Sequence, residues 1–155
     1  MTKKLRQPGV LAAVLTPFDG DFKPNADRMA VHCRRLLDEG CDALAPLGTT
    51  GEANSIGVAD RIGLIGALAE NGLDMGRMIV GTGTPALADS VALARAALGA
   101  GAGGLLVLPP FYYKDPLQEG LYAYFSALAE GIGEANPGIH LYHFPQMSAV
   151  AVTVE

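Results

Sequence analysis

The sequence contains no tryptophan, only two cysteines and few charged residues. Lysine and arginine number 11 against 16 aspartates and glutamates, and the formal net charge of -5 predicts no basic surface for nucleic acid. Cys33 and Cys41 have neither the spacing of a metal site nor the number that a disulfide framework requires. Half of the residues are hydrophobic, which excludes an intrinsically disordered chain.

Long hydrophobic runs are also absent, since none approaches the ~20 residues of a membrane-spanning helix. Near the N-terminus, Lys3, Lys4 and Arg6 precede a short apolar run at residues 10–15, an order also found in signal peptides. Pro8 interrupts the pattern, and the apolar run is too short for secretion. The sequence therefore predicts a leader at residues 1–8, a first core strand at 10–15, and a reduced, cytoplasmic protein without a membrane partner.

Glycine is abundant, at 20 of 155 residues, and indicates many tight loops between regular elements. Short apolar runs alternate with longer helical patterns. Strands are predicted at residues 10–15, 41–47, 78–80, 104–108 and 139–144, and helices at 25–39, 60–72, 89–100 and 117–131. Each strand and helix together take roughly 30 residues, as βαβ units do.

The predicted fold is α/β with a parallel sheet, because the strands are continuous apolar runs rather than alternating ones. Two architectures fit this order: an open, doubly wound five-stranded sheet, or part of an eight-stranded (β/α)8 barrel. Length alone favours the open sheet. In both architectures ligands bind at the C-terminal ends of the strands, so candidate site residues are sought in those loops.

The loop after the second strand reads Gly48-Thr49-Thr50-Gly51-Glu52. Its glycines free the backbone so that successive N–H groups can converge on an anion, and the threonines add hydroxyl donors. No lysine follows the glycines, so the loop is not a nucleotide P-loop, and a small carboxylate suits it better. A plain strand-to-helix loop is the alternative, because Gly/Thr loops are common.

Tyrosines follow two further strands. Tyr112 and Tyr113 come after the fourth strand, and Tyr142 stands at the end of the fifth. A phenol at that edge of the sheet can transfer protons to and from a substrate. Aromatic packing in a loop, an interface or the core is the competing interpretation for each of them.

Together these segments resemble the dihydrodipicolinate synthase / N-acetylneuraminate lyase family of pyruvate-type Schiff-base aldolases. The matching motifs are Gly9-Val10, Thr16-Pro17-Phe18, Gly48-Thr49-Thr50-Gly51-Glu52, Pro110-Phe111-Tyr112-Tyr113, Gln118-Glu119-Gly120-Leu121-Tyr122, and Tyr142 with Pro145. The resemblance implies a (β/α)8 TIM barrel, of which residues 9–155 supply about the first five βα units. It covers only the N-terminal portion of that single domain.

By this resemblance, Thr49 and Thr50, with Gly48 and Gly51, bind the carboxylate of a 2-oxo acid such as pyruvate. Thr49 also joins a hydroxyl relay with Tyr112 and Tyr142, in which Tyr142 transfers protons to and from the substrate. The residue matching Tyr112 reaches into the neighbouring subunit's site in this family, which implies a homo-oligomer, a dimer or tetramer. Tyr113 takes that role if the loop register differs by one residue.

The Schiff-base lysine of the family belongs to the next strand and is expected beyond Glu155. Lys3, Lys4, Lys23 and Lys114 do not replace it, because an imine-forming lysine needs a desolvated position and these lie in the leader or in loops. We therefore expect the 155-residue chain alone to be inactive. The mechanism requires no cofactor and no metal.

Two departures from the family pattern bear on the substrate. Met147 stands where an arginine binds the second substrate's carboxylate in true dihydrodipicolinate synthases, and His143 stands where asparagine is usual. The pattern therefore favours a sugar-acid aldolase or lyase. His140 and His143, three residues apart on a strand, face opposite sides and are not expected to bind a metal.

Two alternatives to the lyase remain open from the sequence. One is a flavodoxin-like open sheet with an anion site at residues 48–51 or 81–83. The other is a non-catalytic half-barrel that self-associates through the bare edges of its first and fifth strands.

Overall fold

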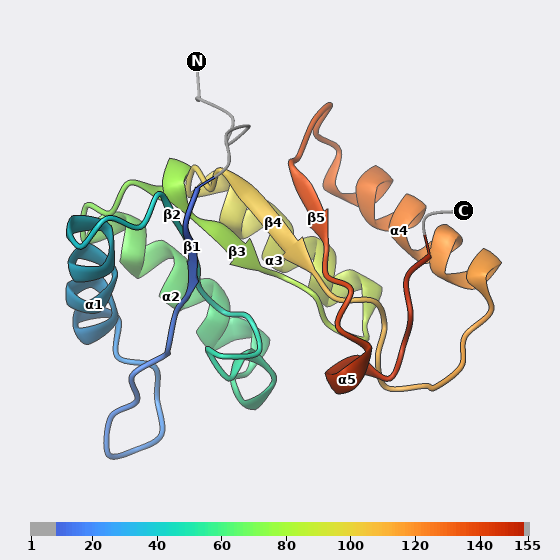
Figure 1. Cartoon of the computed structure of the whole chain (residues 1–155), viewed down its shortest axis with the longest axis horizontal. Helices are drawn as coiled ribbons and strands as arrows, with labels where there is room; N and C mark the ends of the chain where they lie inside the picture. Colours follow the sequence, from blue (N-terminus) through green and yellow to red (C-terminus); the bar gives the residue numbers. More distant parts are fainter. Residues whose placement is uncertain (1–8, 154–155) are drawn as a thin grey trace.

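Five short parallel strands alternate with helices, as the apolar runs predict (Figure 1). The computed structural model describes residues 9–153, so the leader predicted at residues 1–8 lies outside the described residues. The strands are β1 (Leu11–Ala13), β2 (Ala43–Ala45), β3 (Ile79–Gly81), β4 (Gly104–Val107) and β5 (Ile139–Leu141). The helices are α1 (Ala26–Asp38), α2 (Val58–Glu70), α3 (Leu87–Gly99), α4 (Gln118–Ile132) and the short α5 (Pro145–Ser148), with 3-10 turns η1 (Ala53–Ser55) and η2 (Met75–Arg77).

The strands lie side by side in chain order. β1 pairs with β2, and β3 pairs with β4 and β4 with β5, all in parallel. The two groups meet where Leu44 forms a parallel bridge to Met78 and the Gly81 N–H donates to Pro46 O at 2.9 Å. The order β1-β2-β3-β4-β5 is that of a barrel wall and differs from the 2-1-3-4-5 order of a flavodoxin-like sheet. The preference for an open sheet drawn from length is therefore wrong.

The four long helices form one layer that follows the strands. α1 packs on α2, α2 on α3 and α3 on α4, so successive helices are neighbours, whereas a doubly wound sheet distributes them over two faces. Figure 1 shows this progression from blue α1 at one end to orange α4 at the other. The core between helices and strands contains Leu44, Leu68, Leu93 and Leu105, all at most 1% exposed.

The start of α1 follows directly from its sequence. Asn25 precedes the helix in an extended conformation, and its side-chain Oδ1 accepts a hydrogen bond from the Arg28 N–H at 2.9 Å. This is the N-cap interaction that asparagine supplies best, because it satisfies a backbone donor that the first helical turn leaves without a partner. The predicted helix start at residue 25 is confirmed within one residue.

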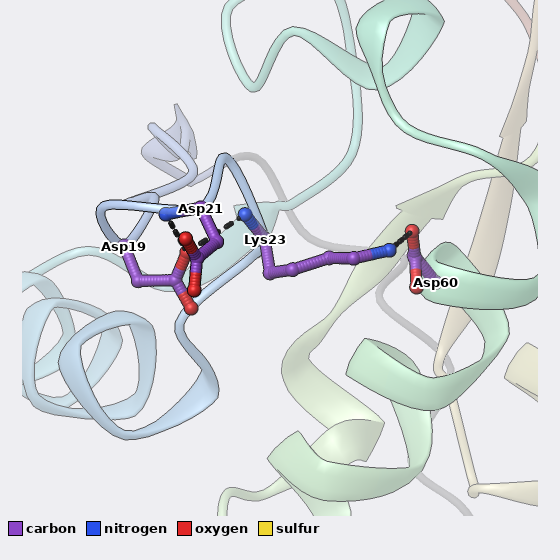
Figure 2. A network of polar contacts seen from close by, with 4 residues as sticks. All are labelled: Asp19, Asp21, Lys23 and Asp60. Carbon is purple, nitrogen blue, oxygen red and sulfur yellow. Dashed lines mark hydrogen bonds and ion pairs between the residues drawn. The ribbon is translucent and has the colours of Figure 1, made fainter.

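The loop between β1 and α1 is held by a polar network (Figure 2). Asp19 Oδ1 accepts hydrogen bonds from the backbone N–H groups of Asp21 and Lys23, each at 2.9 Å. The Lys23 ammonium then pairs with Asp60 Oδ2 on α2 at 2.9 Å. Lys23 therefore has a structural partner that ties the loop to α2.

The two outer strands are more exposed than their apolar sequences predict. Leu11 on β1 is 46% exposed, Leu15 just after it is 57% exposed, and Leu141 on β5 is 50% exposed. Each of these strands pairs on one side only within the described chain. The prediction that both faces of each strand are buried is confirmed for β2 and β3 and is wrong for β1 and β5. Among residues 9–153, no further strand pairs with the outer edge of β1 or of β5.

The fifth strand is also shorter than predicted. Residues 142–144 leave the sheet after the Tyr142 N–H donates to Val107 O at 2.8 Å. Pro145 then opens the short helix α5, where its fixed φ and missing N–H suit the first helical position. Tyr142 and His143 therefore lie in the loop after the strand, at its C-terminal end.

Candidate functional site

A hollow of about 260 Å³, counted with its opening to solvent, lies at the C-terminal ends of β2 to β5. Its lining comes from the loop after β2, the end of β3, the end of β4 and the first residue after β5. These residues are Leu47, Gly48, Thr49, Ala53, Asn54, Gly81, Gly83, Leu106, Leu108 and Tyr142. The hollow is small and mostly apolar, with a few polar groups, as in sites for small ligands.

The loop after β2 has an unusual backbone. Leu47, only 1% exposed, has φ of 59°, and Glu52 has φ of 53°, both in the left-handed region that bulky residues avoid. The loop is held in this shape by hydrogen bonds from the Glu52 N–H to Thr49 O at 3.1 Å and from the Thr16 hydroxyl to Gly51 O at 2.7 Å. Strained residues fixed in this way cluster at ligand sites, which makes this loop the strongest candidate.

Gly81 allows β3 to approach this loop closely. A Cβ on Gly81 would lie 1.9 Å from Leu47 O, so only glycine fits between β3 and the loop after β2. Gly83 is similarly confined, since its Cβ would lie 2.5 Å from the Leu108 backbone nitrogen. Both glycines line the hollow, as do Gly48 and Thr49. The segments at residues 48–51 and 81–83, which the sequence offered as alternative anion sites, therefore adjoin the same hollow.

A buried arginine lies behind the end of β3. Arg61 on α2 is 2% exposed, and its Nη2–H donates to Gly81 O at 3.0 Å. Burial lowers the pKa of Arg61 to about 10, an effect that the carboxylate of Asp89 partly opposes, so the guanidinium is charged at neutral pH. Among residues 9–153 neither Arg61 Nε nor the Oγ1 of buried Thr82 has a hydrogen-bond partner. Because Arg61 contacts Gly81 and Gly81 lines the hollow, the charged guanidinium favours an anionic ligand in the hollow.

Three of the residues predicted for the site line the hollow: Gly48, Thr49 and Tyr142. Thr50 is exposed and is not part of this lining. Gly51 is buried behind the loop, where a Cβ would lie 2.8 Å from Val14 O. Gly51 thus shapes the loop in this structure rather than contacting the hollow.

The tyrosines after β4 lie outside the hollow of their own chain. Tyr112 and Tyr113 are 69% and 81% exposed, and their rings pack edge to face with centroids 5.1 Å apart. Lys114, predicted to be a solvated loop charge, is exposed but donates to Phe111 O and to Ser148 O of α5. Any role of Tyr112 in a hydroxyl relay therefore requires contact with a second subunit or movement of this loop.

The residues that depart from the family pattern follow Tyr142 in the chain, and neither is among the residues that line the hollow. His143 is exposed, and its Nδ1 accepts a hydrogen bond from the Val152 N–H at 3.1 Å, which leaves Nε2 as the donor nitrogen of the ring. Met147 on α5 is 61% exposed.

Sequence reasoning missed Arg61, Asn54, Leu106 on β4 and Leu108 directly after it. A signal for Arg61 was present, because it shares the spacing i, i+3, i+4 and i+7 with Leu64, Ile65 and Leu68, the buried face of α2. An arginine on an otherwise apolar helix face indicates a buried charge with a specific partner. Leu106 and Leu108 carried no comparable signal, because any strand residue of this type packs in a core.

Among residues 9–153 there is no group of three or more histidine, cysteine, aspartate or glutamate side chains placed to hold a metal ion. Over the same residues, no helix has both the length and the apolar character needed to cross a bilayer.

Comparison with known proteins gives consistent matches. The chain is 40% identical over 146 residues to an uncharacterized DapA-like lyase of Chloroflexus aurantiacus, covering 94% of this chain but 48% of that protein. The fold matches dihydrodipicolinate synthase from Agrobacterium tumefaciens with a TM-score of 0.86 and 34% identity, over 92% of this chain and 50% of that one. YagE, a prophage protein from E. coli K12 solved in complex with pyruvate, matches with a TM-score of 0.83 and 26% identity, covering 94% of this chain and 47% of that one.

The chain thus spans about half the length of the relatives that it matches. Its strand order, its helix layer and its hollow at the C-terminal strand ends agree with the TIM-barrel fold of these neighbours. With the match running over residues 6–155, the chain belongs to the dihydrodipicolinate synthetase family.

Proposed function

We propose that this chain is part of a lyase or aldolase that acts on 2-oxo acids through a lysine Schiff base. The observation that carries the proposal is the convergence of Gly48, Thr49 and Tyr142 on one hollow, with the buried charge of Arg61 behind it. A small carboxylate suits such a site by charge. YagE, with which this fold is shared, was solved in complex with pyruvate, which supports a pyruvate-like ligand.

In this proposal the loop after β2 binds the carboxylate of the substrate. Thr49 donates its hydroxyl at the hollow, and Thr50 and Gly51 complete the loop without lining it. Tyr142, at the end of β5, faces the same hollow and can pass a proton to or from the reacting carbon or its oxygen. The carbonyl carbon of the substrate is attacked by a lysine amine, water leaves, and the resulting iminium accepts electrons when the C–C bond breaks.

We infer that the lysine comes from the barrel strand that follows β5, beyond residue 155. Lys23 pairs with Asp60 and Lys114 lies at the exposed loop near α5, so neither adjoins the lining of the hollow. Tyr112, exposed on its own chain, would complete the relay in a second subunit of a cytoplasmic homodimer or tetramer. No cofactor is required by this chemistry.

The two departures from the family pattern, at His143 and Met147, favour a sugar acid over the second substrate of a true dihydrodipicolinate synthase. Met147 supplies no positive charge for a second carboxylate, and His143 presents its Nε2–H as a donor for a hydroxyl group. We therefore propose a 2-keto-3-deoxy sugar acid or a similar polyhydroxylated 2-oxo acid as the substrate class.

Borohydride trapping tests the mechanism. A protein extended through the remaining barrel strands, incubated with pyruvate and borohydride, should gain the mass of one reduced pyruvate on a single lysine. Residues 1–155 alone should gain none. Thr49→Val and Tyr142→Phe should slow trapping in the extended protein by about 10²-fold or more, while Tyr122→Phe, at an exposed position of α4, should not. Failure of every 2-oxo acid to form an adduct would refute the Schiff-base proposal.

The exposed apolar edges of β1 and β5 favour a second candidate, a non-catalytic half-barrel that self-associates. Light scattering of residues 1–155 distinguishes the two. A soluble monomer of 16.0 kDa would count against self-association. A discrete dimer of residues 1–155 would support it, provided that the protein extended through the remaining barrel strands also forms no adduct with pyruvate.

A further inference from the structure

A network of hydroxyl groups joins the β3–α3 loop to α3 and α4. Ser90 on α3 is fully buried, and Thr84 in the loop is 6% exposed. The Thr84 N–H donates to Ser90 Oγ at 2.9 Å, and Ser90 Oγ lies 2.9 Å from the Tyr124 hydroxyl. The Tyr124 hydroxyl donates to Thr84 O at 2.9 Å. Both backbone groups of Thr84 are therefore bound by side chains from two different helices.

Tyr124 acts in this network as a neutral hydrogen-bond donor. Burial raises the pKa of Tyr124, and the hydrogen bond with Ser90 opposes this only in part. Phe125 packs edge to face on its ring, with centroids 5.4 Å apart, and restricts its orientation. The phenol therefore retains its proton at neutral pH and can keep donating it to Thr84 O.

The segment that this network holds reaches the hollow. Thr84 directly follows Gly83, which lines the hollow beside Leu108. Gly83 is pressed against Leu108 so closely that a Cβ would lie 2.5 Å from the Leu108 nitrogen. Gly81 lies two residues before Gly83, and its carbonyl oxygen accepts a hydrogen bond from Arg61 Nη2–H at 3.0 Å. The wall formed by Gly81 and Gly83 is thus fixed from α2 on one side and from α3 and α4 on the other.

We propose that Tyr124, through Thr84, is a positioning residue that sets the place of Gly83 in the wall of the substrate site. Tyr124 is not among the residues that line the hollow, so its effect is exerted through the backbone of residues 82–84. This inference rests on the proposed binding of a 2-oxo acid in that hollow. Thr84 O also lies 3.2 Å from Ser90 Oγ, so loss of the Tyr124 hydroxyl removes the shorter of two donor contacts to this oxygen. The wall then moves more easily, which weakens binding of substrate and transition state alike.

The test uses Tyr124→Phe and Ser90→Ala in the extended, active protein, with Tyr122→Phe as a matched control. Tyr122 lies two residues from Tyr124 on α4 but is 78% exposed, so the control removes a hydroxyl outside the network. Two measurements are made: amide hydrogen exchange of the peptide covering residues 82–86, and kcat and KM for the 2-oxo acid.

Tyr124→Phe should accelerate exchange in residues 82–86 and raise KM by about 5- to 10-fold, as for the loss of one hydrogen bond, with kcat within about twofold. Ser90→Ala should do the same, and the double variant should lose little more because the two side chains share one network. A merely structural role would lower the folded fraction and kcat without raising KM. If Tyr124→Phe does not fold, Ser90→Ala carries the test.

Unchanged exchange at residues 82–86, or accelerated exchange with KM unchanged, would overturn the inference. If the wild-type protein binds no 2-oxo acid, the proposed function fails, and with it the assignment of the wall to a substrate. The exchange data then decide separately whether Tyr124 holds the loop.

Discussion

Replacement of Gly81 by alanine is the most direct perturbation of the contact between β3 and the loop after β2. The new Cβ would lie 1.9 Å from Leu47 O, 2.5 Å from the Leu47 carbonyl carbon and 2.9 Å from the Gly48 nitrogen. These are backbone atoms, so no side-chain rotation relieves the clash. The strand and the loop have to move apart by more than about 1 Å to reach ordinary van der Waals contact.

The free-energy cost follows from what that movement disturbs. Overpacking of a buried position costs about 1–3 kcal/mol. The same shift stretches the hydrogen bond from the Gly81 N–H to Pro46 O and the one from Arg61 to Gly81 O, worth about 1 kcal/mol and 1.5–3 kcal/mol, respectively. We therefore expect Gly81→Ala to reduce the free energy of unfolding by about 3.5–7 kcal/mol, a large share of the ~5–15 kcal/mol of a typical domain.

Urea unfolding followed by circular dichroism measures this difference through the transition midpoint. Gly66→Ala in α2 is the matched control, since no atom lies within 4 Å of its added Cβ and alanine favours a helix by about 1 kcal/mol. The control should be unchanged or more stable. A Gly81→Ala protein within 1 kcal/mol of wild type would refute the close packing of β3 on the loop after β2.

Four further outcomes are expected. Cys33, buried and with its pKa raised to about 11, should react with a thiol reagent only on unfolding, whereas the half-buried Cys41 reacts in the native protein. Because the folded thiol holds its proton more tightly than the unfolded one, Cys33 should make stability fall as pH rises from 9 to 11, and Cys33→Ala should flatten that slope in pH-dependent melting. Asn25→Ala should lower the free energy of unfolding by about 1 kcal/mol through loss of the α1 cap; an unchanged urea midpoint would contradict the capping geometry. Lys23→Met removes the exposed ion pair with Asp60 and should change the free energy of unfolding by less than about 1 kcal/mol, measured by thermal melting. A larger change would show that the network of Figure 2 stabilises the protein more than its exposure implies.

Local chemistry made the elements predictable. The apolar runs located the five strands and the helical periodicity located α1 to α4, because each signal lies within a short stretch of chain. The end of β5 was misplaced, since residues 142–144 are apolar enough for a strand and only the turn into Pro145 removes them from the sheet. The short α5 gave no periodic signal at all.

The candidate site was predictable in part. Gly48 and Thr49 stood out by composition, and Tyr142 stood out through the family resemblance; all three line the hollow. Arg61 could not be assigned to the candidate site from the sequence, because its partner is the backbone oxygen of Gly81, 20 positions later and on another element. Tyr124 was missed for the same reason, since its contact with Thr84 spans 40 positions.

The sequence by itself determined the α/β class, the order of the units and the loop chemistry, because these depend on the types and spacing of neighbouring residues. The residue patterns, without the family resemblance, left the strand order open between a barrel and an open sheet, and the tertiary structure decided it. β3 lies beside β2 because Gly81 lets their backbones meet, and that contact excludes an open flavodoxin-like order. The same contact unites two glycine-rich loops, 33 residues apart at Gly48 and Gly81, in one hollow. Such long-range packing has no local signature, since it depends on the space that two distant segments leave for each other.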